Sequence, residues 1–267
     1  MDVVERINQA TWATKFEIMP GIFTPGVLPV NPKVFLDRYK ETADLSGKTV
    51  LDIGAFDGAV VFEAERRGAK AHAMDIQDPD KTAFNTAKSI LNSEVEYQQG
   101  TVYDLESMYG ADFFDVVFFK GVYYHLKDPL RAFEAVSKVL KPQGFAIIAG
   151  ELLVSHGEDL SGNLVDVSEM AQSDVPITLC YPGHLPSDPR TTTWFVPNLA
   201  CMKSWLKGTG LVLIDHSIIH DPNIVPRPIQ RFVGLVHNSG QAVVEHPVME
   251  RGWTNGKEQR FRKPDKE

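Results

Sequence analysis

The 267-residue sequence predicts an α/β protein with one doubly wound, seven-stranded sheet. Three observations predict this fold class. Short apolar, β-branched segments alternate along the chain with segments whose apolar residues recur at helical spacing. The first strong strand ends in a glycine-containing turn that opens a helix, which is typical of open α/β sheets. The contents of hydrophobic residues, 43%, and of charged residues, 23%, are those of an ordinary globular domain.

The predicted sheet is organised around residues 50–58, Val-Leu-Asp-Ile-Gly-Ala-Phe-Asp-Gly. A buried parallel strand runs into Asp52, and Gly54 then permits a sharp backbone turn beneath a ligand. Gly58 allows the following helix to pack close to the strand, and the helix ends at Gly68. The segment therefore predicts a ligand site at the carboxyl end of this strand.

The spacing of the glycines indicates which ligand fits. A dinucleotide fingerprint needs glycine at the first, third and sixth positions, so that the backbone can approach a pyrophosphate. Counted from Gly54, the third and sixth positions hold Phe56 and Ala59. Phe56 places a bulky side chain where a diphosphate would lie, which argues against a nicotinamide-dependent reductase. The pattern suits a nucleoside without phosphates; chance glycines in an ordinary strand-turn-helix are the alternative.

The second predicted strand, residues 69–76, ends in an acid that could bind ribose. Asp75 lies about twenty residues past the glycine turn, where doubly wound folds place an acceptor for the ribose hydroxyls. Ile76 follows it and is assigned to the same site. The alternative is that Asp75 caps the next helix, but Asp78 and Asp80 stand closer to that helix.

Residues 113–120 are nearly continuously apolar, which predicts a central strand buried on both faces. This strand ends in Lys120 and delivers residues 121–126, Gly-Val-Tyr-Tyr-His-Leu, to the sheet edge where ligands bind in open α/β folds. Glu151 lies just past the fifth strand, 145–149, at the same edge. The other predicted elements are helices at 32–39, 81–91, 130–140 and 195–206, and strands at 95–100, 211–219 and 230–237, the last two as a hairpin-like pair.

The domain organisation follows from these elements. Residues 1–30 form an N-terminal extension that either covers a sheet edge or folds over the active site as a lid. Residues 31–240 form the main domain. Within it, about residues 155–195, between strands five and six, are rich in Gly, Pro, Ser and Asp, which predicts a lid or substrate-binding insertion. Residues 241–267 form a polar tail.

Charge and composition bear on partners and location. The net charge of −8 argues mildly against nucleic acid and favours a small-molecule substrate. No apolar run is long enough to span a membrane and the N-terminus is no signal peptide, so a cytoplasmic location without membrane association is expected. The two cysteines, Cys180 and Cys201, fit a reducing compartment. The oligomeric state stays open.

The order of five features resembles the class I S-adenosylmethionine (SAM)-dependent methyltransferases. The features are the 50–58 motif, Asp75, Asp104, the pair Tyr124-His125 and the Lys-Pro-Gln-Gly segment at 141–144. The resemblance implies a Rossmann-like methyltransferase sheet with SAM as cofactor. In these enzymes an acid after the third strand accepts a hydrogen bond from the adenine amine, a role that falls on Asp104 unless it is an ordinary loop residue. The residues assigned to cofactor binding are Asp52, Gly54, Phe56, Gly58, Asp75, Ile76, Asp104 and Lys120.

A narrower resemblance links the chain to the tRNA wobble-uridine (carboxymethyl) methyltransferases and their short small-molecule relatives. The segments that carry it are Trp12 with Thr24-Pro25-Gly26, residues 51–58, residues 121–129, and Phe195 to Asn198 with Trp205-Leu206. In the tRNA enzymes a lysine, a tyrosine and an arginine hold the extra carboxylate of carboxy-SAM, and the matching positions are Lys15, Tyr124 and Arg231.

The chain also departs from the tRNA enzymes. They are longer at the N-terminus, and Leu126 stands where they have the first of two basic residues. We therefore expect ordinary SAM and an O or N nucleophile of a small molecule. Methylation or carboxymethylation of tRNA, with carboxy-SAM, is the first alternative. A catalytically inactive SAM-binding protein is another, against which the intact Asp52, Gly54, Gly58 and Asp75 argue.

Methyl transfer from a sulfonium is an in-line displacement in which the protein mainly supplies alignment. A base is needed only if the acceptor carries a proton near neutral pH, and His125 is the candidate because imidazole titrates in that range. Tyr124 would orient the acceptor or cover the sulfonium with its ring. A structural His125 that caps its turn is the alternative. The residues assigned to substrate binding are Lys15, Tyr123, Glu151 and Arg231. No metal is expected, because no tight His/Asp/Glu cluster is visible.

Overall fold

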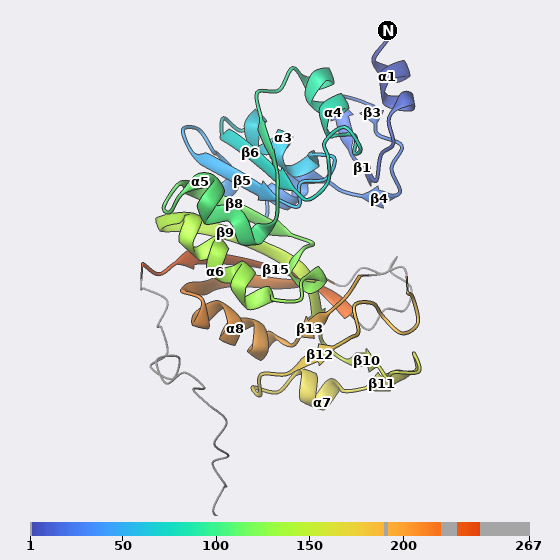
Figure 1. Cartoon of the computed structure of the whole chain (residues 1–267), viewed down its shortest axis with the longest axis vertical. Helices are drawn as coiled ribbons and strands as arrows, with labels where there is room; N and C mark the ends of the chain where they lie inside the picture. Colours follow the sequence, from blue (N-terminus) through green and yellow to red (C-terminus); the bar gives the residue numbers. More distant parts are fainter. Residues whose placement is uncertain (1, 190–191, 220–228, 241–267) are drawn as a thin grey trace, which may run out of the picture.

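The computed structural model describes residues 2–189, 192–219 and 229–240 of the chain. Their largest element is one seven-stranded sheet (Figure 1). The five strands from β9 to β7 run parallel, and β15 is antiparallel to both of its neighbours, β9 and β14. This confirms the predicted doubly wound sheet and the final strand pair. In spatial order the strands are β14 (Leu211–Ile219), β15 (Ile229–Asn238), β9 (Leu140–Leu153), β8 (Phe114–Lys120), β5 (Thr49–Ile53), β6 (Lys70–Asp75) and β7 (Glu96–Gln99).

Helices cover both faces of the sheet because successive residues of the central strands point to opposite sides. In β8, Phe118 packs into one core and Phe119 into the other, and both are fully buried. The first face is covered by α2 (Pro32–Leu36), α3 (Ala59–Arg66) and α4 (Phe84–Leu91), and the second by α5 (Leu105–Tyr109), α6 (Pro129–Val139) and α8 (Leu199–Gly208). No helix in the described part of the chain is long and apolar enough to cross a bilayer.

The starts of three helices follow from capping residues in the sequence. The Asn31 side chain accepts the amide of Val34 at α2, and the Asp128 side chain accepts that of Arg131 at α6, where a proline also occupies the first turn. Asn198 caps α8 in the same way. Residues 195–197, predicted to open this helix, instead form strand β13 (Phe195–Pro197), so α8 begins only after its cap.

Several predicted boundaries were wrong by a few residues, and the largest difference lies in β9. The fifth strand was predicted at 145–149, but β9 already begins at Leu140 and continues to Leu153. Lys141 reaches back to Asp115, 2.8 Å away, and Gln143 takes a positive φ of 68° where the pairing with β8 shifts register. The irregularity is therefore a bulge inside one long strand. Helix α4 begins at Phe84 rather than at residue 81, and α2 ends at Leu36 rather than at residue 39.

The N-terminal extension packs on the helical layer of the first face. Its apolar anchors Trp12, Phe16 and Ile18 are buried in the same core as α3. Arg6 donates to Ser89 of α4 at 2.7 Å. Its strands pair only with one another in the described structure, so it does not extend the main sheet. The elements of the extension are α1 (Val3–Gln9), β1 (Thr14–Lys15), β2 (Glu17–Met19), β3 (Ile22–Phe23) and β4 (Leu28–Pro29).

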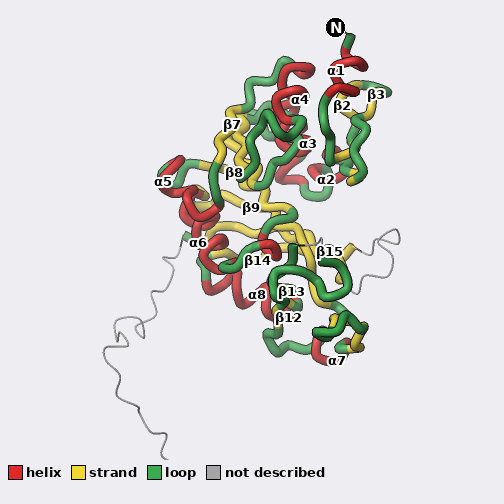
Figure 2. Tube along the Cα trace, turned by 45° about the vertical axis from the view of Figure 1, so that its right-hand side comes forward, coloured by secondary structure: helices red, strands yellow, loops and turns green. Residues whose placement is uncertain are grey.

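The insertion has more regular structure than the sequence predicts. It forms two small antiparallel pairs, β10 with β11 and β12 with β13, around its own small core, which includes Tyr181 and Leu185. Figure 2 shows β12, β13 and α7 at the end of the molecule opposite α1, β2 and β3. The bounds are β10 (His156–Glu158), β11 (Leu164–Asp166), α7 (Ser168–Ala171) and β12 (Thr178–Cys180). The described chain also contains the short 3₁₀ helices η1 (Lys40–Thr42), η2 (Val102–Asp104) and η3 (Tyr123–His125).

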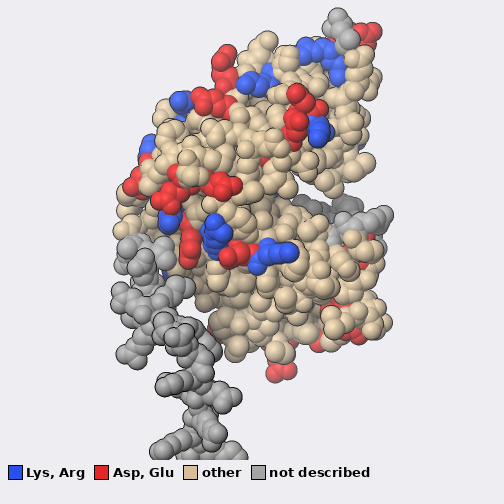
Figure 3. Space-filling model, viewed as in Figure 1, with Lys and Arg blue, Asp and Glu red and all other residues tan. Residues whose placement is uncertain are grey.

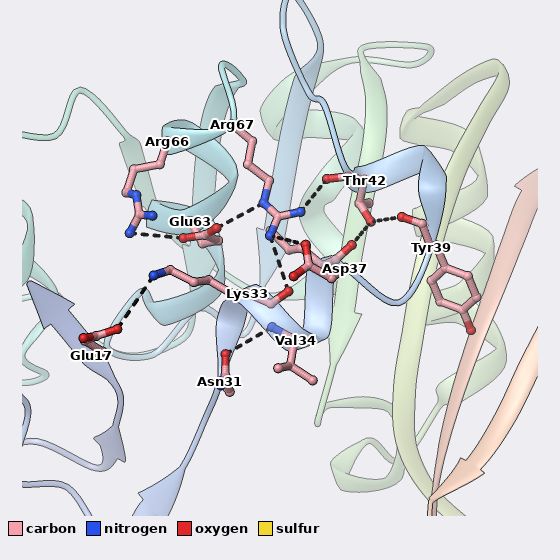
Figure 4. A network of polar contacts seen from close by, with 11 residues as sticks. Glu17, Asn31, Lys33, Val34, Asp37, Tyr39, Thr42, Glu63, Arg66 and Arg67 are labelled. Carbon is pink, nitrogen blue, oxygen red and sulfur yellow. Dashed lines mark hydrogen bonds and ion pairs between the residues drawn. The ribbon is translucent and has the colours of Figure 1, made fainter. Parts of the chain in front are cut away.

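An ion-pair network joins α2 to α3 (Figure 4). The Arg67 guanidinium donates to Glu63 at 3.1 Å and to the backbone carbonyl of Thr42 at 3.0 Å, and it lies 2.8 Å from Asp37. Only 11% of the Arg67 side chain and 6% of the Glu63 side chain are exposed. This network fixes the end of the helix that begins at the glycine turn.

Candidate functional site

Three charged side chains converge at the carboxyl edge of the sheet. Asp52 in β5, Asp75 in β6 and Lys120 in β8 come from neighbouring parallel strands, which end at the same edge. Asp52 is 4% exposed and Asp75 is 6% exposed. Two carboxylates and one ammonium are thus held close to the glycine turn, as the sequence predicted.

The electrostatics of Asp52 favour a cationic ligand group. Burial raises the pKa of Asp52 well above its usual range, the nearby Lys120 opposes this, and Asp75 adds to it. An additional positive charge in the site would stabilise the ionised carboxylate. Asp52 lines a cavity of about 60 Å³ together with Thr14, Val30, Gly54, Ala55, Phe56, Ala59, Val60 and Lys120.

The glycine turn has the backbone conformation that its sequence predicts, with one exception. Gly54 has a φ of 74°, and a Cβ atom there would lie 2.6 Å from Val122, so the turn and the segment after β8 are in close contact. Phe56 has a φ of 51° although it is not glycine. This conformation costs a bulky residue about 1–2 kcal/mol. The Phe56 side chain lines the cavity and is 37% exposed.

Asp75 holds the turn in place. Its Oδ2 accepts the Phe56 amide at 3.0 Å, and its Oδ1 accepts the Gln77 amide at 3.0 Å. A carboxylate has about four acceptor positions, so each oxygen keeps one for a ligand hydroxyl. Ile76, 66% exposed, presents apolar surface directly beside it. The geometry is thus compatible with the predicted ribose role, which stays a prediction.

Asp104 lies in η2, beyond the end of β7. The residue is exposed, and its Oδ2 accepts the hydroxyl of Thr101 at 2.6 Å. This local bond orients the carboxylate and leaves its other oxygen for an adenine amine. The predicted adenine role of Asp104 stays a prediction.

Tyr123 is a core residue, which corrects its assignment to substrate binding. Its side chain is fully buried, and its hydroxyl donates to the backbone carbonyl of Glu151. A Cβ atom on Gly150 would lie 2.4 Å from the Tyr123 ring, so glycine at this position makes room for the ring. Burial raises the pKa of the Tyr123 hydroxyl well above its ordinary value. The next residue, Tyr124, is only partly buried.

Tyr124 and His125 lie together in η3, with ring centroids 4.1 Å apart. Nδ1 of His125 contacts the backbone carbonyl of Thr192. Because a carbonyl only accepts, Nδ1 carries the proton and Nε2 of the neutral ring keeps its lone pair. The residue as a whole is exposed, yet enough of the chain surrounds its ring to lower the pKa of His125. This tautomer and charge state are those of a base that acts through Nε2.

The end of the insertion is fixed against η3. The Trp194 amide donates to the Tyr124 carbonyl at 2.7 Å, next to the contact between Thr192 and His125. Lys127 lies 4.8 Å from the centroid of the Trp194 ring, a cation–π contact. The end of the insertion therefore lies beside Tyr124 and His125, and its role as a lid or substrate-binding segment stays a prediction.

The remaining predicted substrate residues come from separate elements. Lys15 is exposed in β1, next to Thr14 of the cavity wall. Glu151 in β9 stands opposite Arg231 of β15 in the backbone register. The side chain of Arg231 lies outside the described part of the structure, so its predicted role stays a prediction. In the described ranges, no group of three or more His, Cys, Asp and Glu residues could hold a metal ion.

Sequence reasoning missed Asp57, which accepts four hydrogen bonds beneath the site. The only signal in the sequence was an acidic residue within a turn of otherwise small or apolar residues.

Comparisons with known proteins find similarity to methyltransferases. A family described as "Methyltransferase domain" matches residues 51–148. A tRNA U34 carboxymethyltransferase of Helicobacter pylori (strain Shi470) is 28% identical over 185 residues, which are 65% of this chain and 60% of the relative. That of Klebsiella pneumoniae (strain 342) is 27% identical over 175 residues, 64% of this chain and 45% of the relative. The chain thus spans less than two thirds of these curated relatives.

Solved structures share the fold at low identity. A putative SAM-dependent methyltransferase from Listeria monocytogenes has a TM-score of 0.56 and 18% identity, covering 78% of this chain and 97% of that one. The 1,6-didemethyltoxoflavin-N1-methyltransferase of Burkholderia thailandensis, with bound 1,6-didemethyltoxoflavin and S-adenosylhomocysteine, has a TM-score of 0.54 and 14% identity, covering 78% of this chain and 76% of that one. At these identities the likeness concerns the fold.

Proposed function

We propose that this chain is a class I SAM-dependent methyltransferase that transfers a methyl group from SAM to an oxygen or nitrogen of a small molecule. The observation that carries the proposal is the position of Asp75. This buried carboxylate is held by the glycine turn and keeps acceptor capacity at the sheet edge. Phe56 occupies the place that a diphosphate would need, which favours a nucleoside such as that of SAM.

The residues at the edge fit the parts of SAM. When bound, SAM supplies a methyl group already activated on a sulfonium. Asp75 would accept the ribose hydroxyls, and Ile76 would pack beside the adenine. The small cavity next to Asp52 would hold the methionyl end, where a positively charged group relieves the unfavourable burial of the Asp52 carboxylate. Lys120 in the same cavity would bind the carboxylate of that end.

Tyr124 and His125 would act on the acceptor. During methyl transfer, Nε2 of His125 would take the proton that the acceptor oxygen or nitrogen loses. The contact with the Thr192 carbonyl orients the ring for that step. The partly exposed Tyr124 ring lies beside it and would align the acceptor.

Two observations bear on the acceptor. Acidic and basic side chains are interspersed on the face drawn in Figure 3, and the net charge is −8, which favours a small molecule over an RNA backbone. The two curated relatives described above are tRNA U34 carboxymethyltransferases, which favours a second candidate function, methylation or carboxymethylation of tRNA. That function would use carboxy-SAM, with Lys15, Tyr124 and Arg231 around its extra carboxylate.

Titration calorimetry with SAM, S-adenosylhomocysteine and carboxy-SAM tests the cofactor. We expect SAM to bind and Asp75→Ala to weaken its binding, whereas binding of NADH in place of SAM would refute the proposal. A preference for carboxy-SAM that Arg231→Met abolishes would support the second function. Labelled transfer to total tRNA, compared with transfer to a panel of phenols, carboxylates and amines, then separates the two acceptor classes.

A further inference from the structure

The carboxylate of Asp57 connects three separate parts of the chain beneath the cavity. The residue is fully buried and follows Phe56 in the glycine turn. Its Oδ2 accepts the amide of Ala13 at 2.9 Å and both the amide and the hydroxyl of Thr14 at 2.8 Å. Its Oδ1 accepts the amide of Ala83, just before α4, at 3.2 Å. One side chain thus joins the turn, the N-terminal extension and the loop after β6.

The segment that Asp57 anchors is a folded unit. Strand β1 pairs in parallel with β4, and the Leu28 amide donates to the Ala13 carbonyl at 2.9 Å. The buried Thr24 hydroxyl donates to the Thr14 carbonyl at 2.7 Å. At Gly26 the returning backbone passes so close that a Cβ atom would lie 2.3 Å from Thr14 backbone atoms. Anchoring Ala13 and Thr14 therefore places the whole segment from residue 13 to residue 30.

This segment forms part of the cofactor cavity. Thr14 and Val30 line the same cavity as Asp52, Phe56 and Lys120. Asp57 itself is not among the lining residues. The wall contributed by the N-terminal extension thus depends on a carboxylate that lies behind it.

We propose that Asp57 is a positioning residue of the cofactor site: it fixes residues 13–30 as one wall of the pocket, so cofactor affinity depends on a side chain that does not touch the cofactor. This inference rests on the proposed function, because it concerns the site that binds SAM. Under this proposal the N-terminal extension is a fixed part of the cofactor site. It also explains an acidic residue in the glycine turn, where its charge would otherwise be unfavourable to bury.

The test measures S-adenosylhomocysteine affinity by titration calorimetry for the wild type, Asp57→Ala and Asp57→Asn. We expect Asp57→Ala to raise the dissociation constant by about tenfold or more, and Asp57→Asn by less, because the amide keeps one acceptor oxygen. Turnover at saturating SAM should stay within about twofold of wild type, so the KM for SAM rises while kcat does not. Asp44→Asn, which changes an exposed aspartate, is the matched control.

A second variant moves the wall without touching Asp57. Gly26→Val places a side chain against the Ala13–Thr14 backbone, and we expect it to weaken S-adenosylhomocysteine binding as well. Gly21→Asn is its control, because Gly21 lies in the same segment with open space around it and asparagine tolerates its φ of 76°. Hydrogen exchange of the peptide that contains Ala13 and Thr14 should become faster in Asp57→Ala and Gly26→Val, but not in the two controls.

The outcomes separate the two proposals. If the wild type binds neither SAM nor S-adenosylhomocysteine, the proposed function fails, and this inference fails with it. If the wild type binds and both Asp57→Ala and Gly26→Val keep its affinity while their N-terminal peptides exchange faster, only this inference is overturned. Should Asp57→Ala fail to fold, Asp57→Asn and Gly26→Val decide the question by the same comparison.

Discussion

Replacement of Asp75 by alanine gives the sharpest test of the cofactor site. The carboxylate is 6% exposed, and two of its acceptor positions are used by the amides of Phe56 and Gln77, each at 3.0 Å. Two positions remain for the ribose hydroxyls. A hydrogen bond to a charged group contributes about 1.5–3 kcal/mol, and water in the space left by the side chain recovers part of it. We expect a net loss of about 2–3 kcal/mol, which corresponds to a 30- to 150-fold weaker dissociation constant.

The assay is titration calorimetry with S-adenosylhomocysteine and with its 2′-deoxy analogue, on the wild type and on Asp75→Ala. If Asp75 accepts the 2′-hydroxyl, removing both groups costs less than the sum of the two single losses. Thermal unfolding in the absence of ligand measures how far the turn loosens when the Phe56 amide loses its acceptor. Additive losses would exclude a bond from the 2′-hydroxyl to Asp75, and an Asp75→Ala affinity within twofold of wild type would remove Asp75 from the ribose role.

Four further predictions concern other parts of the structure. His125→Ala should slow turnover by about 100-fold or more while its affinity for S-adenosylhomocysteine stays unchanged, and an unchanged rate at pH 7 contradicts the base role. In the wild type, ¹⁵N NMR should place the proton of the neutral His125 ring on Nδ1. Arg67→Met should lower the free energy of unfolding in urea by about 2 kcal/mol, because it leaves the buried Glu63 with fewer partners; a change below 0.5 kcal/mol, roughly that of an exposed pair, contradicts this. His72 is 3% exposed, neither ring nitrogen is hydrogen-bonded, and Nδ1 lies 3.4 Å from the Glu96 carboxylate. Burial lowers the pKa of His72 more than Glu96 raises it, so below about pH 6.5 the unfolded chain binds a proton more readily than the folded chain. Stability should therefore fall from pH 7 to pH 5, and less steeply in His72→Leu; equal slopes would refute this. Phe56→Gly should be more stable than Phe56→Ala by about 0.5–1 kcal/mol in thermal unfolding, because both variants lose the ring but only alanine keeps the strain of a positive φ. The reverse order of stability would contradict the inference that the backbone at Phe56 is strained.

The central part of the sheet could be predicted from the sequence because its local signals agree. The 50–58 motif combines a buried strand, an acid and glycines at positions that need positive φ, as found at Gly54 and Gly58. The continuous apolar run of β8 likewise predicts a strand between two helical layers. Local pattern and tertiary environment require the same residues there.

The structure differs from the sequence-based predictions where contacts between distant residues determine the conformation. The register of β9 depends on a bulge at Gln143 and on the pairing of Lys141 with Asp115, which no local period reveals. Tyr123 and Tyr124 cannot be told apart by local sequence pattern. In the structure Tyr123 is buried in the core, whereas Tyr124 is only partly buried and lies at the site. The contacts of Asp57 span 44 and 26 residues along the chain, so only the folded structure brings its donors together.

The order of strands in the sheet also constrains how the chain folds as it leaves the ribosome. Among the strands in the described part of the chain, β15 is made last, yet it lies between β14 and β9, both of which are made before it. Until residues 229–238 are synthesised, the long strand β9 has an open edge and β14 has no neighbour in the main sheet. An open edge of this length invites pairing between chains, so nascent or truncated chains that lack β15 should aggregate. The last described strand therefore covers the edge of β9 when it joins the sheet.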